Sequence, residues 1–242
     1  MNEDAALVLL PGLDGTGDLF APLCAALAAC PAMRITPQIV RYPGHTVLDY
    51  QGLAPLARAA CPSDRPFYLL GESFSGPLAL QLAAQSPAGL RGVILCASFI
   101  RNPHPHAARI APLATLLPIQ LAPPSLMSFA LLGQYSTPPL RAALAQAVRQ
   151  ASHTVLRQRL LSVTKIDVSQ ELRQLRVPLL YLQASQDRIV PARAWREIHA
   201  LQPLAHKVSV AAPHCLLQAA PQAAAAALLD FFQHCTAQQA ST

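Results

Sequence analysis

The sequence predicts an α/β fold: a mostly parallel sheet flanked by helices, with a helical cap inserted near the middle of the chain. Short apolar runs alternate with helix-like patterns in both halves of the chain, which is typical of parallel strands joined by helices. A turn rich in small residues, 71–76, joins one such run directly to a helix-forming segment. Between residues 98 and 167 the alternation stops, and eight prolines divide that segment into short helix-like pieces.

Each expected strand is a short run of apolar residues bounded by turn residues. The expected strands cover residues 6–10, 34–42, 67–72, 92–97, 178–183 and 207–211. The helices between them begin near capping residues or prolines. They are expected at residues 18–30, 50–60, from the turn to 86, 192–201 and 221–232. Strands separated in this way by helices can lie parallel in one sheet.

The length of 242 residues suits one α/β domain with an insertion. We expect the core to comprise residues 1–100 and 168–242, and the cap to comprise residues 101–167. The cap segment is rich in leucine and alanine and is too long for a plain loop. The sequence therefore predicts a helical insertion that covers the edge of the sheet.

The net charge of +6 comes from the region of the cap, since residues 101–176 hold nine basic and two acidic residues. A basic cap would attract an anionic substrate or a carrier protein, although a solvated helix face that keeps an apolar cap soluble explains the same charges. Nucleic acid is not an expected partner, because the arginines are not interleaved with aromatic residues.

Composition also bears on location and cofactors. No apolar stretch approaches the length of a transmembrane segment and the start lacks signal-peptide features, so we expect a cytoplasmic protein. The six cysteines form no C-x-x-C pair and lie in apolar or helical stretches, so they are expected to be buried free thiols. His104 and His106 have no cysteine or carboxylate neighbours, so neither a metal site nor a cofactor is expected.

Ser73 is the candidate nucleophile, because it lies in the turn between a strand-like run and a helix. A serine at such a corner adopts a strained backbone conformation that exposes its hydroxyl. Close packing of strand and helix requires small residues around it, and Gly71 and Ser75 fill these positions in a G-x-S-x-S-G pattern. Glu72 is expected to point away from the site and to have a structural role.

A serine hydroxyl needs a base, and the base needs an acid that fixes its tautomer. His214 follows the last expected strand and Asp187 follows the strand before it, so both are expected at the same sheet edge as Ser73. Asp167 is an alternative acid, but it precedes a helix-like segment and has the character of an N-cap. The candidate triad is therefore Ser73, Asp187 and His214.

A tetrahedral intermediate needs hydrogen-bond donors for its oxyanion. The glycine-rich loop 10–17 directly follows the first strand, and the amide after the serine points into the same space. Leu13 N–H and Phe74 N–H are the candidate donors. The loop lacks the glycine and lysine spacing of nucleotide-binding motifs, so a nucleotide site is not favoured.

Five segments give the chain a resemblance to the α/β-hydrolase superfamily: LPGLDGTG, RYPGH, LLGESFSGPLAL, QDRIVP and APHCLLQ, in this order. The resemblance covers nearly the whole chain, in particular to small bacterial carboxylesterases of the pimeloyl carrier-protein methyl ester esterase type. It implies the α/β-hydrolase fold, a Ser-Asp-His triad and a helical cap between the sixth and seventh strands of that fold. Two positions depart from the family pattern: Pro11 stands where many members have histidine, and Ser75 replaces the elbow glycine.

The expected activity is cleavage of a carboxylic ester with an apolar acyl or alcohol part, through an acyl-enzyme and without a cofactor. A thioesterase or an acyltransferase would use the same triad, and a ligand-binding protein would need only the scaffold. The apolar stretch 126–132 predicts one wall of the substrate pocket. The candidate pocket residues are Leu126, Met127, Phe129 and Leu132.

Overall fold

The computed structural model describes residues 4–30, 34–105 and 123–240. At its centre lies a six-stranded sheet in which all neighbouring strands run parallel, in the order β2-β1-β3-β4-β5-β6. The strands are β1 (Ala5–Leu10), β2 (Ile35–Ile39), β3 (Phe67–Glu72), β4 (Leu90–Cys96), β5 (Leu179–Ala184) and β6 (His206–Val210). This is the α/β architecture that the alternating pattern predicts, and the fold class is confirmed.

The central strands are buried on both faces, because their residues are apolar at nearly every position. In β1, Leu7 and Leu9 pack into the layer on one face, whereas Ala6 and Val8 pack into the layer on the other. The edge strands β2 and β6 are partly exposed. Continuous apolar runs in the sequence therefore mark the strands in the middle of the sheet.

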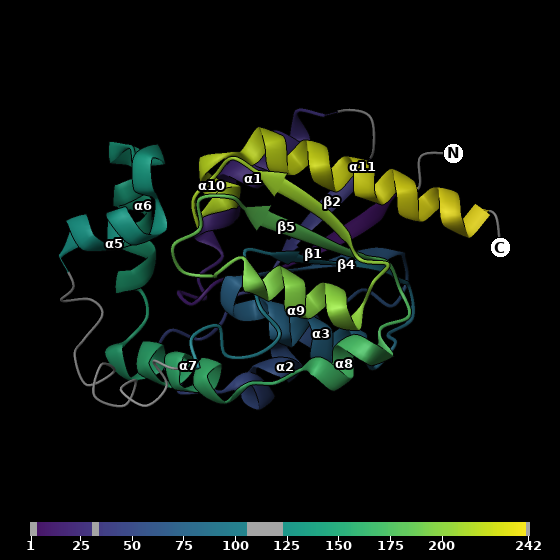
Figure 1. Ribbon diagram of the computed structural model, residues 1–242, viewed down its shortest axis with the longest axis horizontal. Helices are drawn as coiled ribbons and strands as arrows, with labels where there is room; N and C mark the ends of the chain where they lie inside the picture. Colours follow the sequence, from purple (N-terminus) through teal and green to yellow (C-terminus); the bar gives the residue numbers. More distant parts are fainter. Residues whose placement is uncertain (1–3, 31–33, 106–122, 241–242) are drawn as a thin grey trace.

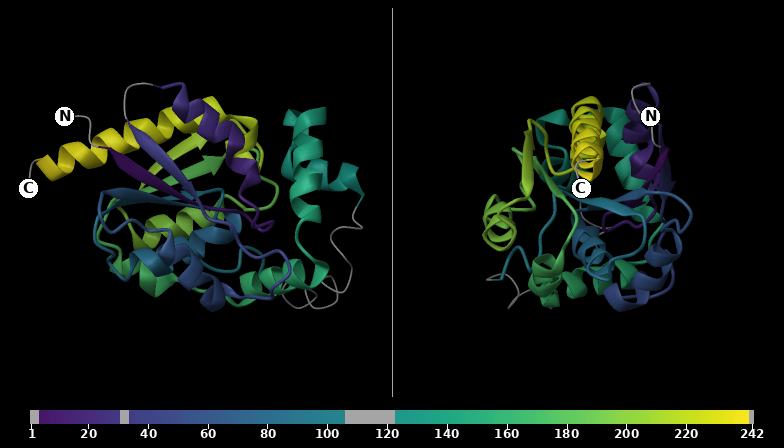
Figure 2. Two further views of the ribbon diagram at one scale, coloured as in Figure 1. Left: turned by 180° about the vertical axis from the view of Figure 1, so that it is seen from behind. Right: turned by 90° about the vertical axis from the view of Figure 1, so that its right-hand side faces the viewer.

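Helices cover both faces of the sheet (Figures 1 and 2). One face packs against α1 (Ala21–Ala28) and α11 (Pro221–Ala240). The other face packs against α2 (Tyr50–Ala59), α3 (Gly76–Ala83), α8 (Ser169–Gln174) and α9 (Arg193–Leu201). Short helical segments follow three of the strands: η1 (Asp18–Phe20), η2 (Ser73–Ser75) and α10 (Leu216–Ala219).

The described part of the segment between β4 and β5 forms a helical group at one end of the sheet (Figure 1). It contains α5 (Pro124–Leu131), η5 (Gly133–Tyr135), α6 (Pro138–Arg149) and α7 (His153–Lys165). The strands point their carboxyl ends toward these helices, while β1 begins and α11 ends at the opposite side. Helices in this segment agree with the sequence pattern, and the assignment of residues 101–167 as a cap stays a prediction.

The base of the helical group is closed by backbone contacts. Arg101 and Asp167 form an isolated antiparallel bridge, and the Val168 amide donates a hydrogen bond of 2.9 Å to the Ile100 carbonyl oxygen. The segments before and after the helical group therefore lie side by side, and the limits of 101 and 167 for a cap stay a prediction.

Several element boundaries differ from the expectation by a few residues, and two of the differences have a structural reason. Only residues 35–39 of the second strand pair with β1, because the backbone then turns toward the loop that follows β1, where the Tyr42 amide donates to the Gly15 carbonyl oxygen. Helix α11 continues to Ala240 instead of ending at 232, and Cys235 in this extension is buried against the core.

The structure redistributes the basic residues that the sequence groups around the cap. Arg159 is buried in α7, and Arg173 and Arg176 lie on or just after α8, which packs against α3 and α9 of the core. Arg141 and Arg149 are exposed on α6. The positive charge that solvent meets on the cap is therefore smaller than the residue count suggests.

In the described ranges, no helix combines the length and the hydropathy that a membrane-spanning segment requires. The six cysteines are free thiols, but only Cys96, Cys215 and Cys235 are buried as expected. Cys24, Cys30 and Cys61 are partly exposed, because they lie toward the outer side or the ends of their elements. Within the same ranges, no three His, Cys, Asp or Glu side chains come together in a group that could hold a metal ion.

Candidate active site

Ser73 lies at the corner between β3 and α3. Its φ is +47°, a left-handed conformation that non-glycine residues rarely adopt. Strand and helix approach each other so closely that a Cβ at position 71 would lie 2.6 Å from the Ser75 carbonyl oxygen, which explains Gly71. The corner therefore has the strained geometry that the small-residue pattern predicts.

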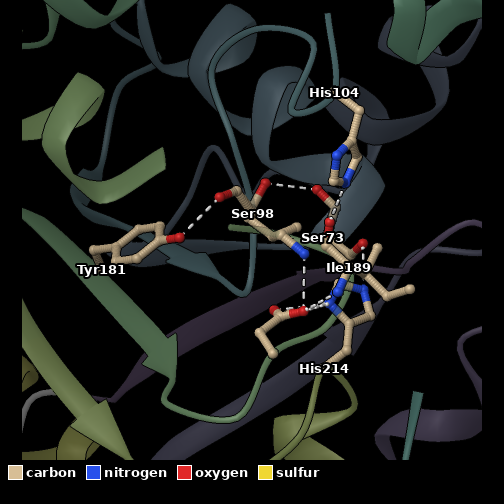
Figure 3. A network of polar contacts seen from close by, with 8 residues as sticks. Ser73, Ser98, His104, Tyr181, Ile189 and His214 are labelled. Atoms are coloured by element: carbon tan, nitrogen blue, oxygen red, sulfur yellow. Dashed lines mark hydrogen bonds and ion pairs between the residues drawn. The ribbon is translucent and has the colours of Figure 1, made fainter. Parts of the chain in front are cut away.

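Hydroxyl groups hold the carbonyl oxygens of this corner. Ser98 Oγ donates a hydrogen bond of 2.6 Å to the Ser73 carbonyl oxygen. Tyr50 Oη donates to the Phe74 carbonyl oxygen over 2.8 Å. Tyr181 Oη on β5 donates to the Ser98 carbonyl oxygen over 2.9 Å and so links a second strand to the corner (Figure 3). These bonds stabilise a backbone conformation that costs roughly 1–3 kcal/mol by itself.

Ser73, His214 and Asp187 form a continuous hydrogen-bonded chain. Ser73 Oγ lies 2.9 Å from His214 Nε2 (Figure 3), and His214 Nδ1 lies 3.0 and 2.9 Å from the two carboxylate oxygens of Asp187. The amides of Ile189 and Val190 donate to Asp187 Oδ1 over 2.7 and 2.8 Å. Because the His214 and Asp187 side chains are only 8% and 5% exposed, water screens their contact weakly.

These contacts determine which tautomer suits the site. An ionised carboxylate only accepts hydrogen bonds, so His214 Nδ1 carries the hydrogen that Asp187 accepts and leaves the Nε2 lone pair facing Ser73 Oγ. In this tautomer the imidazole can take the serine proton. Asp167, the alternative acid, is exposed, and its carboxylate accepts hydrogen bonds from the amide and the hydroxyl of Ser169.

Leu13 and Phe74, the candidate oxyanion donors, line the same cavity as Ser73. Leu13 belongs to the loop after β1, in which Asp14 Oδ2 accepts hydrogen bonds of 2.9 and 2.6 Å from the Thr16 amide and hydroxyl. Phe74 lies in the first turn of a helical segment, where helix geometry leaves amides without an intrahelical partner. The fold therefore brings both residues to the cavity that Ser73 lines, and the role of their amides as oxyanion donors stays a prediction.

A cavity of about 330 Å³ is lined by Ser73 and His214. Most of its wall is apolar and comes from the cap helices and from the loops at the carboxyl ends of the strands. Apolar residues of this wall include Leu19, Phe99, Leu131, Leu144, Val148 and Val163. A cavity with a few polar groups beside an apolar wall suits a substrate with an apolar part.

The structure brings Met127, one of the four candidate pocket residues, to this cavity. Leu126 and Phe129 are instead 59% and 61% exposed. Leu132 is not among the lining residues but is buried in a small cluster with Leu144 and Cys215, which do line the cavity. Helical periodicity is the reason, because Met127 and Leu131 are four residues apart and share the cavity face of α5, which turns Leu126 and Phe129 elsewhere. An apolar stretch identifies the helix, but not the face that it presents.

Glu72 differs from the expectation that it points away from the site, because it lines the cavity next to Ser73. Gln218 Nε2 donates to Glu72 Oε1 over 2.9 Å, and the Gly12 amide also donates to this carboxyl group. Burial raises the pKa of Glu72 to about 7. Glu72 is therefore a titratable group beneath the loop that carries Leu13.

His104 also lines the cavity. Its Nε2 lies 2.6 Å from the Ile189 carbonyl oxygen (Figure 3), and because a carbonyl oxygen only accepts, Nε2 is the donor. This bond ties the start of the cap segment to the loop that carries Asp187. His106, the other histidine of the pair in the sequence, lies outside the described residues.

The RYPGH segment, residues 41–45, has no role assigned from the sequence, but in the structure it is hydrogen-bonded to the loop and the corner that form the site. The Tyr42 amide donates to the Gly15 carbonyl oxygen over 2.8 Å, and Tyr42 Oη lies 2.7 Å from Ser75 Oγ. Arg41 pairs with Asp18 over 2.7 Å, directly after the glycine-rich loop. In the sequence, the one indication of this role is that the segment follows a strand and so lies at the sheet edge where the site is expected.

A model of the family described as Serine aminopeptidase, S33 (Hydrolase_4) matches residues 40–217, more than half of the chain. The match includes the positions of Ser73, Asp187 and His214. A search of curated proteins gives no significant match.

Solved structures share the fold over nearly the whole chain at low sequence identity. A bromoperoxidase from Bacillus anthracis superposes with a TM-score of 0.80 at 14% identity, covering 95% of this chain and 92% of that one. An enol-lactonase from Burkholderia xenovorans LB400 gives a TM-score of 0.73 at 18% identity, with coverage of 95% and 91%. A thermophilic esterase from Thermogutta terrifontis gives 0.75 at 18% identity, with coverage of 96% and 89%.

These likenesses show the α/β-hydrolase fold, and the family match extends over most of the elements that carry the site. The chain therefore belongs to the Serine aminopeptidase, S33 family and is an enzyme of the α/β-hydrolase class.

Proposed function

We propose that this protein is a cofactor-free serine hydrolase that cleaves a carboxylic ester with an apolar acyl or alcohol part. The observation that carries the proposal is the hydrogen-bonded chain of Ser73, His214 and Asp187, which opens on a largely apolar cavity. In this proposal residues 1–100 and 168–242 supply the catalytic core, and residues 101–167 form the cap over it.

The reaction begins when Ser73 Oγ attacks the ester carbonyl carbon and its proton passes to His214 Nε2. The carbonyl oxygen becomes an oxyanion, which accepts hydrogen bonds from the Leu13 and Phe74 amides. Asp187 orients the imidazole and stabilises the imidazolium that forms. When the intermediate collapses, the C–O bond to the alcohol breaks, and the imidazolium protonates the leaving oxygen.

Water then completes the cycle. His214 takes a proton from the water molecule as it attacks the acyl-enzyme, and a second tetrahedral intermediate forms in the same oxyanion site. Collapse of this intermediate returns the proton to Ser73 Oγ and releases the carboxylic acid. In each tetrahedral intermediate the His214 imidazolium balances the negative charge of the oxyanion, and no electrons are exchanged. The mechanism therefore needs no metal or redox group.

An uncharged ester fits the cavity better than the amino terminus of a peptide. The carboxyl groups on the described wall are Asp14, which already accepts from Thr16, and Glu72, which accepts from Gln218. The pKa of Glu72 near 7 leaves it partly uncharged at neutral pH. Both groups are therefore already engaged within the protein, which supports an uncharged substrate over an ammonium group. The structural neighbours described as an esterase and an enol-lactonase also support this choice.

A thioesterase or an acyltransferase remains the nearest alternative, because the same acyl-enzyme can be formed from a thioester or resolved by an alcohol. Product analysis with a competing alcohol distinguishes them, since an acyltransferase makes a new ester where a hydrolase makes the acid.

The test is a series of p-nitrophenyl esters of increasing acyl length, measured with the wild-type protein and with Ser73→Ala. We expect turnover of the wild type to depend on chain length, and Ser73→Ala to lose about 10⁴-fold or more in kcat, because nucleophile and base act as a unit. Ser162→Ala is the control, since Ser162 is also a partly buried serine, bonded to the Gln158 carbonyl oxygen of its own helix. A folded Ser73→Ala protein that keeps most of the turnover would overturn the proposal.

A further inference from the structure

Arg159 is a fully buried arginine that lies in the cap helix α7 yet reaches into the core, and its relative exposure is 1%. Its Nη1 donates hydrogen bonds of 2.8 Å to the carbonyl oxygens of both Leu13 and Asp14. Its Nη2 donates to the Pro43 carbonyl oxygen over 3.1 Å. One cap side chain thus holds the loop that follows β1 and the RYPGH segment beside it.

The space for this guanidinium depends on Gly15. Gly15 has a φ of +75°, and a Cβ at this position would lie 2.5 Å from Arg159 Nη1. The glycine-rich character of the loop is therefore explained in part by the arginine that packs against it. The sequence alone relates these glycines only to a tight turn.

The charge of Arg159 is compensated mainly by carbonyl dipoles. Among the described residues no carboxylate lies within ion-pair distance of it, and the nearby Asp14 carboxylate already accepts hydrogen bonds from Thr16. The face of the Tyr42 ring lies 5.5 Å from the guanidinium carbon. A buried charge of this kind is costly, so its three carbonyl contacts must be kept in close geometry.

The arrangement of the peptide groups shows what these contacts hold. Leu13 N–H belongs to the peptide group between Gly12 and Leu13. In the peptide group before it, the Pro11 carbonyl oxygen accepts a hydrogen bond from Ser75 Oγ, and the Gly12 amide donates to Glu72. In the peptide group after it, the Leu13 carbonyl oxygen is held by Arg159. Both neighbours of the peptide group that carries Leu13 N–H are therefore fixed.

We infer that Arg159 is a positioning residue of the oxyanion site: from the cap, it fixes the Leu13 backbone so that the Leu13 amide faces the carbonyl oxygen of the substrate. The inference rests on the proposed function, because the oxyanion exists only if Ser73 attacks an acyl group. Arg159 itself is not among the residues that line the cavity, so it acts through the backbone and not on the substrate.

The expected effect is on the transition state. Removal of one oxyanion donor typically lowers kcat by about 10²–10³, and a donor displaced by about 1 Å can cost on the order of 10². Binding of the substrate before the reaction depends mainly on the apolar wall of the cavity, whereas the Leu13 amide donates its hydrogen bond to the oxyanion of the transition state. A positioning role therefore predicts a fall in kcat and in affinity for an oxyanion analogue, with little change in KM, at temperatures where the variant is fully folded. A loss of folded protein would also lower the apparent kcat without changing KM, but it would lower the melting temperature and would leave the inhibitor affinity of the remaining folded protein unchanged.

The experiment compares Arg159→Lys and Arg159→Ala with the wild type. Lysine keeps the charge and the stem, but its compact ammonium cannot reproduce the planar fork that serves three carbonyl oxygens. Lys165→Gln is the matched control, because Lys165 is an exposed cation on the same helix. For each protein we would measure kcat, KM, the melting temperature and the affinity for a trifluoromethyl ketone, whose adduct with Ser73 places an oxyanion in the site.

We expect Arg159→Lys to lose about 10-fold or more in kcat and in affinity for the trifluoromethyl ketone, with KM within a few-fold of the wild type. Millimolar guanidinium ion should restore part of the kcat of Arg159→Ala by occupying the vacated site. Lys165→Gln should behave as the wild type. A folded Arg159→Lys protein with unchanged kcat and inhibitor affinity, or with parallel losses in Lys165→Gln, would overturn the inference.

The two proposals fail in different ways. If Ser73→Ala keeps its turnover, the proposed function is wrong whatever Arg159 does. If Ser73→Ala is inactive while Arg159→Lys matches the wild type, the triad stands and the positioning role of Arg159 alone is wrong. If Arg159→Ala does not fold, Arg159→Lys, which keeps the buried charge and the stem, still gives the decisive comparison.

Discussion

Ser98 Oγ donates a hydrogen bond of 2.6 Å to the carbonyl oxygen of Ser73, and so joins the ends of two neighbouring strands. Ser73 has a φ of +47°, and Ala97, which directly precedes Ser98, has a φ of +46°. Both residues lie in the left-handed region, where an L-residue is strained. The hydrogen bond links these two strained points and explains why Gly76 has no side chain: a Cβ there would lie 1.9 Å from Ser98 Oγ.

We predict that Ser98→Ala lowers both stability and turnover. The variant leaves the buried Ser73 carbonyl oxygen without this donor, which costs about 1–3 kcal/mol in the free energy of unfolding. It also relaxes the corner, so kcat should fall by about 10-fold while KM changes little. Urea denaturation and ester kinetics measure the two effects. Ser162→Ala is the control, and equal losses in both variants would show that the corner is not special.

Asp187→Asn should lower kcat by on the order of 10³–10⁴, because the amide nitrogen of asparagine donates to His214 Nδ1 and favours the tautomer that cannot accept the serine proton. Asp167→Asn is the matched control, since the same substitution there removes a charge at an exposed position, while the remaining amide oxygen can still accept from Ser169. Steady-state kinetics of both variants decide between the two acids. A larger loss in Asp167→Asn would reverse the assignment.

Glu72 should make the stability of the protein depend on pH. Burial raises its pKa from 4.5 to about 7 in the folded state, so between these values the folded protein holds a proton that the unfolded chain has released. The free energy of unfolding therefore falls as pH rises through this window, by at most about 3 kcal/mol, and the contribution is constant above it.

Glu72→Gln removes this dependence, because glutamine stays uncharged and can still accept from Gln218 Nε2. Relative to the wild type, the variant should gain more stability at pH 8 than at pH 5. Urea denaturation of both proteins at the two pH values gives the comparison, in which other titrating groups largely cancel. An equal difference at both values would mean that Glu72 does not titrate in this window.

If the exposed cations of the cap attract an anionic substrate or a carrier protein, ionic strength should reveal it. We expect kcat/KM for an anionic ester to fall steeply with added salt, while kcat/KM for a neutral ester of equal length stays flat. Replacing the exposed Arg141 and Arg149 and the half-buried Arg157 with glutamine should remove the difference.

Arg173→Gln combined with Arg176→Gln is the control for this test, because these exposed arginines lie on or after α8, on the core side of the molecule. Equal salt responses for the two esters would mean that the basic residues of the cap do not attract the substrate and serve only as a solvated surface.

Sequence patterns are enough to predict the fold class and the candidate chemistry. Apolar runs such as 6–10 predict buried strands because a strand covered on both faces is apolar at nearly every position. The order of Ser73, Asp187 and His214 along the chain, each after a strand, predicts that they meet, because parallel strands bring their carboxyl ends to one edge. Both are local sequence patterns from which the arrangement of the strands, and so the position of the site, can be predicted without other sequences.

The residues that surround the candidate site can be identified only from the packing of the helices in three dimensions. Arg159 looks like any other basic residue of the cap, and its burial depends on how α7 docks on the loop after β1. Phe129 and Met127 are similar in the sequence, yet only the docking of α5 decides which of them meets the cavity. Contacts between residues more than a hundred positions apart depend on packing that no local pattern encodes. The hydrogen bond from Arg159 to the Leu13 carbonyl oxygen could therefore not be inferred before the fold was known.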